Sequence, residues 1–341
     1  MSLISSLYTA CLRPILFRCD PEDVHNTALA LGSYASTHTT ARHVMRRVFT
    51  YRHPMLEQTL CGMYLKNPLG LAAGFDKNGH MGEAWEALGF GFAEIGSVTA
   101  KPCMGNAKPR LWRLPEKKSI IVNYGLANDG ADAIYARIPR TTFPLGISIA
   151  PTNSQEIATV SDAIADVCFT YMKFLDKASY YTLNISCPNT HGPRWFLDPD
   201  NLALLLNDLE KLPHIRPLFI KLSANLPDKI LDTLVALASQ YQIDGFVCTN
   251  LGDNNPTIYP GGVSGGLLRA RSNEILARIY QKTRGTVPLI GVGGVFSAQD
   301  AYEKICLGAS AVQCITGMIY AGPTFVRDVS KNLVKILQRD G

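Results

Sequence analysis

The sequence lacks the patterns that mark membrane-spanning and secreted proteins. Nowhere do about 18 apolar residues follow one another without interruption, which is the length that a membrane-spanning helix needs. The start of the chain has no basic stretch followed by an apolar segment and a cleavage site. We therefore expect a protein that neither spans a membrane nor is secreted.

The sequence also lacks the spacings that proteins use to bind zinc or to form redox-active disulfides. Its nine cysteines are an odd number and contain no C-x-x-C pair, and no Cys/His spacing fits a zinc finger. The H-E-x-x-H motif of zinc proteases is absent as well. We expect reduced cysteines, as in intracellular proteins, and no metal ion bound by protein side chains.

Charged residues are scarce and scattered. They make up 18% of the chain against 47% apolar residues, and 33 Lys and Arg against 28 Asp and Glu leave a net charge of +5. The densest basic stretch is 42–52. A solvated basic face is a better interpretation than a nucleic-acid site, while an anionic lipid or ligand stays open. A chain of this length and composition can bury the large core of a globular enzyme.

From Leu60 onward, short apolar runs alternate with segments compatible with helices. The expected strands span residues 69–74, 93–98, 144–149, 180–186, 218–223, 245–250, 289–295 and 311–317. Near-continuous apolar strands joined by helical crossovers predict a parallel sheet, and eight of them predict a closed (β/α)₈ TIM barrel. An open doubly wound sheet is the alternative, but no G-x-G-x-x-G motif opens a helix after the first strand.

Residues 1–50 are expected to form a small N-terminal helical extension ahead of a barrel domain at 51–341. An amphipathic stretch runs up to Pro14, and a second helix is expected from Asp20, as its N-cap, with Pro21 in its first turn, to Gly32. Such helices can cover the bottom of a barrel, or lie on a membrane with arginines facing the lipid head groups. The pattern leaves both possibilities open.

A dense polar cluster ends the expected strand 180–186. Its members are Asn184, Ser186, Cys187 and Asn189, and Pro188 stops the strand because it lacks an N–H. Polar side chains end other expected strands too: Asp76, Lys77, Ser97, Thr99, Lys221, Ser223, Thr249 and Asn250. Because the carboxyl ends of barrel strands form the active face, we expect these groups to meet there.

Glycines gather near the ends of the last two expected strands. Gly293-Gly294 and Thr316-Gly317, with the preceding Gly261–Gly265, let backbone N–H groups approach a phosphate closely. Lys221 lies within an apolar strand, where it could pair locally or face an electron-rich heterocycle such as a reduced flavin. Lysines, carboxamides, a thiol and a phosphate loop without a metal site suggest flavin redox chemistry on a polar ring.

Several motifs make the chain resemble the dihydroorotate dehydrogenases over essentially its whole length. They are Asn67–Gly79, Glu94–Thr99, Gly105–Leu114, Asn184–Thr190, Gly261–Gly265 and Ile290–Gly294. The helical start with Asp20–His25 is similar to the membrane-associated, quinone-reducing class 2 of that family. The resemblance implies an FMN barrel of pyrimidine biosynthesis, peripheral membrane contact through residues 1–50 on the cytoplasmic side, and a quinone entrance between the N-terminal helices.

The resemblance also implies roles for individual residues. FMN is expected against Ala73, Gly74, Lys77, Ser97, Asn184, Lys221, Thr249, Gly265, Gly294 and Thr316. The substrate ring is expected against Lys77, Asn184, Asn189 and Asn250. The catalytic base falls on Cys187. Class 2 members normally have Ser there and class 1 members Cys, so the chain combines a class 2 frame with a class 1 base.

Some positions depart from the family pattern. Val122 stands where a substrate-binding Asn is usual, Ser148 replaces an Asn, Leu251 a Thr and Ile315 a Tyr. Asn123, one residue late, is a candidate to compensate for Val122. Three hypotheses remain: a quinone-dependent dihydroorotate dehydrogenase, a divergent flavin oxidoreductase acting on another cyclic amide or enone, and a catalytically idle FMN-binding or membrane-scaffold protein.

Overall fold

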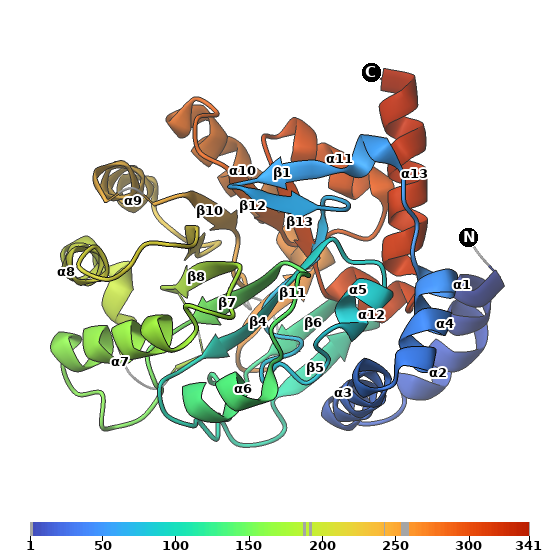
Figure 1. Ribbon diagram of the computed structural model, residues 1–341, viewed down its shortest axis with the longest axis horizontal. Helices are drawn as coiled ribbons and strands as arrows, with labels where there is room; N and C mark the ends of the chain where they lie inside the picture. The colour runs from blue at the N-terminus through green and yellow to red at the C-terminus, as the bar shows by residue number, and fades with distance from the viewer. Residues whose placement is uncertain (1–2, 187–188, 191–192, 242, 254–258, 341) are drawn as a thin grey trace.

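A closed barrel of eight parallel strands forms the body of the protein (Figure 1). The computed structural model describes residues 3–186, 189–190, 193–241, 243–253 and 259–340. Around the barrel the order is β10-β12-β13-β3-β4-β7-β8-β9. The strands are β3 (Leu69–Leu71), β4 (Phe92–Val98), β7 (Leu145–Ile149), β8 (Tyr180–Asn184), β9 (Leu218–Leu222), β10 (Gly245–Cys248), β12 (Leu289–Val292) and β13 (Ala311–Cys314). The predicted TIM barrel is confirmed.

Several strands end earlier than the sequence suggested. β3 and β12 stop three residues before the expected positions, where Gly74 and Gly293 take positive φ values of 110° and 117°. Such angles suit glycine but not a strand, so the chain turns into the rim loops there. Of the polar residues expected at strand ends, Asp76, Lys77, Thr249 and Asn250 therefore lie on loops at the carboxyl end of the barrel, whereas Ser97, Asn184 and Lys221 lie in the last residues of their strands.

Helices surround the barrel and bury one face each against it. They are α5 (Ala84–Ala87), α6 (Ala131–Arg137), α7 (Val160–Lys173), α8 (Pro199–Leu209), α9 (Asp228–Gln240), α10 (Arg269–Thr283), α11 (Ala298–Cys306), α12 (Thr316–Ala321) and α13 (Phe325–Asp340). In α8 the buried leucines 202, 205, 206 and 209 recur at helical spacing. The N-cap side chains of Thr159, Asp198 and Ser297 bind the first backbone N–H groups of α7, α8 and α11.

An apolar plug closes the amino end of the barrel. The hairpin of β1 (Gln58–Leu60) and β2 (Met63–Leu65) contributes Leu60 and Leu65. These side chains cluster with Phe92, Tyr180, Phe219, Val247, Ile290 and Ala311 from the barrel strands. Tyr180 and Phe219 pack edge to face, with ring centroids 5.7 Å apart. The closed amino end leaves the carboxyl end as the place for a site.

A small antiparallel sheet, which the sequence did not reveal, joins distant parts of the chain. Its strands are β5 (Leu111–Leu114), β6 (Ser119–Val122) and β11 (Gly262–Gly265), with β6 in the middle. Ile121 pairs with Trp112 on one side and with Val263 on the other. The glycine-rich segment expected to form part of a phosphate loop is thus largely a strand.

The N-terminal helices pack on one side of the barrel, at the right in Figure 1. They are α1 (Leu3–Leu7), a π-helical turn (Tyr8–Leu12), α2 (Arg13–Leu16), α3 (Pro21–Thr37) and α4 (Thr39–Phe49). The predicted end of the second helix at Gly32 is wrong. Gly32 lies inside α3 and does not end it. A Cβ at this position would come within 2.2 Å of the Met81 side chain, so the glycine lets α3 pack closely against Met81.

The extension is held to the barrel by specific bonds. The Tyr8 hydroxyl donates to the Ile319 carbonyl over 2.7 Å, and Arg13 donates to the Tyr320 carbonyl over 2.9 Å. Arg46 of α4 forms a 2.6 Å ion pair with Glu86 of α5. No helix in the described part of the chain is long and apolar enough to cross a membrane.

The plug generates a stability prediction. Phe219→Ala should lower the free energy of unfolding by about 3–5 kcal/mol, because it removes a buried ring and leaves a cavity. Phe169→Ala is the matched control, since Phe169 lies on α7 and is 47% exposed, and it should change stability by less than about 0.5 kcal/mol. Urea unfolding followed by circular dichroism measures both. Equal losses in the two variants would contradict the role given to the plug.

Candidate functional site

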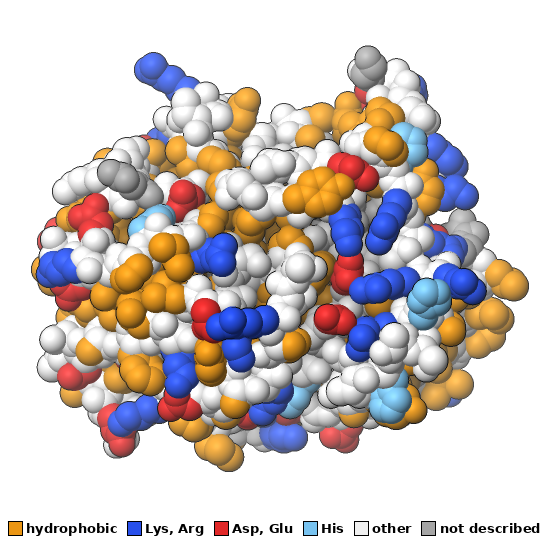
Figure 2. Space-filling model, in the orientation of Figure 1, with side chains coloured by type: hydrophobic (Ala, Val, Ile, Leu, Met, Phe, Trp, Pro, Cys, Tyr) orange, Lys and Arg blue, Asp and Glu red, His pale blue; other side chains and the backbone are white. Residues whose placement is uncertain are grey.

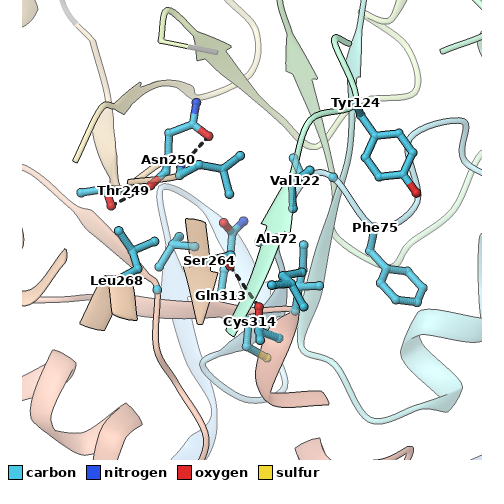
Figure 3. Close-up of a pocket in the computed structure, with 18 of the residues that line it drawn as sticks. Ala72, Phe75, Val122, Tyr124, Thr249, Asn250, Ser264, Leu268, Gln313 and Cys314 are labelled. Atoms are coloured by element: carbon cyan, nitrogen blue, oxygen red, sulfur yellow. Dashed lines mark hydrogen bonds between the residues drawn. The ribbon is translucent and has the colours of Figure 1, made fainter. Parts of the chain in front are cut away.

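A cleft opens at the carboxyl end of the barrel, opposite the plug. It encloses about 1220 Å³, counting the part open to solvent. Its walls come from the ends of the barrel strands and from the small β5-β6-β11 sheet. Figure 3 shows Thr249 and Asn250 on one side of this cleft and Val122, Tyr124 and Phe75 on the other. Its size and mixed lining are typical of a site for a small molecule or cofactor.

The cleft brings together most of the residues expected to form a site. Those that line it are Ala73, Gly74, Lys77, Ser97, Asn184, Asn189, Lys221, Thr249, Asn250, Gly294 and Thr316. Gly265 is not among the described lining residues, although its neighbour Ser264 is and bonds to Thr316 over 3.0 Å. Cys187 lies outside the described residues. The individual roles of all these residues stay predictions.

Asn184 is the centre of a hydrogen-bonded network on the cleft wall. Its Nδ2 donates to Ser97 Oγ over 2.8 Å, and its Oδ1 accepts from Asn250 Nδ2 over 2.9 Å. Ser97 also bonds to Ser148 over 2.9 Å, while Asn250 reaches Ser186 over 3.2 Å. Side chains from four strand ends are thereby fixed relative to one another, which pre-orients them for a polar ring.

The opposite wall presents a backbone group and an apolar side chain. Asn189 Nδ2 donates to the Val122 carbonyl over 2.8 Å, and Asn189 Oδ1 is buried without a hydrogen-bond partner among the described residues. Asn123 Oδ1 instead accepts from Asn106 over 2.9 Å, and Asn123 does not line the cleft. The suggestion that Asn123 compensates for Val122 therefore finds no support in the contacts.

Two lysines bring positive charge to the cleft. Lys221 in β9 is only 5% exposed. The Lys77 ammonium lies 3.7 Å from the centroid of the Tyr124 ring, a cation–π distance. Burial, and after it the charge of Arg110, lower the pKa of Lys77 to about 8. At pH 7 the group is therefore still predominantly charged and can hold an anion.

The residues of the cleft fit FMN. Gly293 and Gly294 line it with φ values of 117° and 71°, and a Cβ on Gly294 would lie 2.3 Å from Arg269. A side chain at Gly294 would collide with Arg269, and the positive φ values of both glycines suit a loop whose backbone N–H groups can approach a phosphate closely. Buried Lys221 and the unpartnered Oδ1 of Asn189 supply polar contacts for a ring. Within the described ranges, no group of three or more His, Cys, Asp or Glu residues could hold a metal ion.

A second, apolar cleft of about 1970 Å³, likewise including open space, adjoins the first. The N-terminal helices form one wall, with Leu7, Tyr8 and Phe49 among its residues. The two clefts share His25, Phe75, Leu111, Ile120 and Ile319. Burial lowers the pKa of His25 to about 3, so its imidazole is neutral at physiological pH.

Sequence reasoning anticipated an entrance between the N-terminal helices, but not the shared wall. Phe75 lies 4.6 Å from the His25 ring, centroid to centroid, and a helix and a rim loop meet there. The sequence places His25 in the first turns of the helix that begins after Asp20. It does not indicate which loop of the barrel the His25 side chain contacts, so its place in the site could not be predicted. Tyr124 and Arg110 were missed for the same reason.

Comparisons with known proteins agree on one family. Residues 55–337 match the family model described as dihydroorotate dehydrogenase. A protein of Gloeobacter violaceus named dihydroorotate dehydrogenase (quinone) is 40% identical over 96% of this chain and 94% of its own length. One of the same name from Natronomonas pharaonis is 37% identical over 97% and 95%. The ligand-free enzyme of Eimeria tenella superposes with a TM-score of 0.83 at 30% identity, over 94% and 96% of the two chains.

The amide network generates a second prediction. Asn184→Ala should weaken FMN binding roughly 10- to 100-fold, because it removes two bonds and leaves Ser97 and Asn250 without their shared partner. Asn123→Ala is the control and should leave FMN affinity unchanged, since Asn123 pairs with Asn106 away from the cleft. Titration of apoprotein with FMN, followed by flavin fluorescence, gives both affinities. A normal affinity in Asn184→Ala would remove Asn184 from the flavin site.

Proposed function

The chain belongs to the dihydroorotate dehydrogenase family, and from that premise we propose that it oxidises dihydroorotate to orotate with a quinone as electron acceptor. The observation that carries the proposal is the direct contact between two unlike clefts. One has a mixed lining whose carboxamides and lysines suit an anionic amide ring, and we call it the polar cleft. The other is apolar and suited to a quinone.

In the proposed reaction the ring of dihydroorotate gains a C5=C6 double bond. FMN, when bound, supplies the chemistry that takes a hydride from C6 and hands two electrons to the acceptor. Asn184, Asn189 and Asn250 hold the amide groups of the ring, and Lys77 holds its carboxylate. Cys187, from the resemblance, takes the proton at C5 through its Sγ, so hydride and proton leave from neighbouring carbons and charge balances.

Cys187 suits a proton acceptor at neutral pH better than a serine would. An unperturbed thiol has a pKa of about 8.5, whereas a hydroxyl needs a strong partner to lose its proton. Two described residues near it in sequence, Ser186 and Asn189, are buried at the carboxyl end of the barrel. Their positions support a base beside the carboxamides that hold the ring.

Residues 1–50 form the acceptor side of the protein in this proposal. Exposed apolar side chains on these helices include Leu3, Leu7, Leu12, Ile15, Leu31 and Val44. Figure 2 shows Lys and Arg side chains together with apolar ones on the side that carries these helices. Apolar groups bordered by basic ones suit the surface of an anionic bilayer, from which a quinone can enter the apolar cleft.

A second candidate substrate is favoured by the apolar part of the ring site. Val122 and Leu251 both line the polar cleft, where each removes a possible hydrogen bond to a substrate. A buried bond left unmade costs about 1–3 kcal/mol. A less polar cyclic amide or enone would lose less at these positions, so the alternative is a flavin oxidoreductase for such a ring.

The direct test is anaerobic reduction of the bound flavin. We expect a yellow protein whose absorbance at about 450 nm, a general property of oxidised flavins, bleaches on addition of dihydroorotate and returns with a quinone. Cys187→Ala should keep FMN and slow the bleaching by roughly 10²- to 10⁴-fold, while Cys187→Ser should keep part of the rate with a higher pH optimum. No bleaching with dihydroorotate, but bleaching with another cyclic amide or enone, would select the second candidate.

A truncation tests the role of the N-terminal helices. Deleting residues 1–50 should leave bound FMN and measurable turnover with a soluble dye, because the flavin residues lie in the barrel. It should abolish reduction of a long-chain quinone, because one wall of the apolar cleft is gone. Thermal unfolding of both forms checks that the barrel survives. Full quinone activity in the shortened protein would refute the acceptor site.

A further inference from the structure

A buried carboxylate on α3 reaches into the loops around the polar cleft. Glu22 is 6% exposed, and its Oε1 accepts from Arg110 Nη2 over 2.8 Å and Nε over 3.2 Å. Its Oε2 accepts from the same Nε over 3.3 Å. The Lys108 ammonium nitrogen lies 3.4 Å from Oε1. Arg110 precedes β5, whose first residue, Leu111, lines both clefts. A buried ion pair therefore joins the N-terminal extension to the rim of the barrel.

Arg110 and Lys77 converge on one aromatic ring. The Arg110 guanidinium carbon lies 4.8 Å from the Tyr124 centroid and the Lys77 ammonium 3.7 Å from it. The Tyr124 hydroxyl is buried without a hydrogen-bond partner in the described structure, so the ring's role is packing. The two cations lie against the same ring with little exposure to water. Such an arrangement needs an anion nearby to offset the repulsion between them.

Asp76, which precedes Lys77 in the chain, does not supply this compensating anion. Asp76 accepts from the backbone N–H groups of His80 over 2.8 Å and of Met81 over 2.9 Å. It also accepts from the indole N–H of Trp85 over 3.1 Å. Its oxygens are occupied in shaping their own loop.

We propose that Glu22 is a positioning residue for Lys77, acting through Arg110 and Tyr124. The carboxylate holds the guanidinium against the ring, the ring supports the ammonium, and the negative charge offsets the repulsion between the two cations. What Lys77 holds, the substrate carboxylate, rests on the proposed function. The structural linkage between Glu22 and Lys77 does not.

The charges around Lys77 fix the sign of the effect. Burial and Arg110 lower its pKa, whereas Glu22 and Asp76 raise it, with a net value of about 8. His25 on α3 faces it as a neutral imidazole, and His80 and Asp129 line the same surface hollow as Lys77. Lys77 therefore loses its charge as the pH rises through about 8. Without the Glu22 charge, that loss moves to lower pH, and an anionic ligand dissociates earlier.

The same turn of α3 serves both clefts. Glu22 and His25 are three residues apart and so lie on one face of the helix. His25 lines the apolar cleft as well as the polar one. Docking of the extension and the charge on Lys77 are thereby linked, so the acceptor-side helices also tune the site for the anionic ring.

The test compares Glu22→Gln with Glu86→Gln in the full-length, FMN-loaded protein. Both substitutions neutralise a carboxylate that ties an N-terminal helix to the barrel, but Glu86 pairs with Arg46 and Lys66. The first readout is the pH midpoint for acetylation of Lys77, measured by mass spectrometry. It should fall by roughly 0.5 to 1 in Glu22→Gln and stay unchanged in Glu86→Gln, because only the uncharged amine reacts.

In Glu22→Gln the amide oxygen can still accept hydrogen bonds from Arg110, so the guanidinium should keep its place and only the negative charge is lost. Arg110 Nη1 also donates to the carbonyls of Met104 over 3.0 Å and of Asn106 over 3.1 Å. The double variant Glu22→Gln/Arg110→Gln removes both opposing charges and should return the midpoint close to that of the wild type. An unchanged midpoint in Glu22→Gln, or an equal shift in Glu86→Gln, would overturn the proposal.

A second readout connects the linkage to turnover. With dihydroorotate at pH 8, Glu22→Gln should raise KM roughly three- to tenfold with a smaller change in kcat, and the basic limb of kcat/KM should move to lower pH. If dihydroorotate is no substrate but the acetylation midpoint moves as expected, the proposed function fails and the positioning role stands. If turnover is normal and the midpoint does not move, the reverse holds.

Discussion

Closure of the parallel sheet is the constraint on which the rest of the structure depends. Each barrel strand has hydrogen-bonded neighbours on both sides, so the sheet has no edge. Phe92, Tyr180 and Phe219 fill the amino end of the barrel. Polar residues of the strand ends can therefore form a site only at the carboxyl end. The amide network of Asn184 and Asn250 follows from that geometry, because both side chains lie at the carboxyl end, one from β8 and one from the loop after β10, and meet across the end of β9.

The burial of charged side chains is a second constraint on the carboxyl end of the barrel. Placing a cation in a partly desolvated site costs free energy unless other groups offset it. Lys77 relies on the Tyr124 ring, which is itself braced by Arg110 and, behind it, Glu22. The anion comes from a segment outside the barrel, so the barrel and its extension are electrostatically one unit. Lys304 shows a different solution below the rim, where Ser272 and Asn273 accept its hydrogen bonds over 2.9 and 2.7 Å.

Much of this arrangement can be predicted from the sequence because it follows from local periodicity. Apolar runs located every barrel strand, and the polar residues near their carboxyl ends, such as Asn184 and Lys221, meet because parallel strand ends share one face. The β5-β6-β11 sheet could not be predicted, since β11 pairs with β6 across a long stretch of chain without a connecting turn. The helix end predicted at Gly32 was wrong for a related reason, because the role of this glycine depends on its contact with Met81 from another part of the chain. The faces of Glu22 and Asn123 likewise depend on docking, which no short pattern records.

The pairing of β13 with β3 bears on how the protein is made. Leu69 pairs with Val312, so the strands that complete the ring are separated by roughly 240 residues of chain. A ribosome must synthesise the chain through Val312 before this pair can form, and earlier strands wait with unpaired edges. The cofactor cleft draws on the loop after β3 and on β13, so it cannot form before both strands have been made. Flavin capture is therefore a late event in biogenesis, and the incomplete barrel is the species most in need of chaperones.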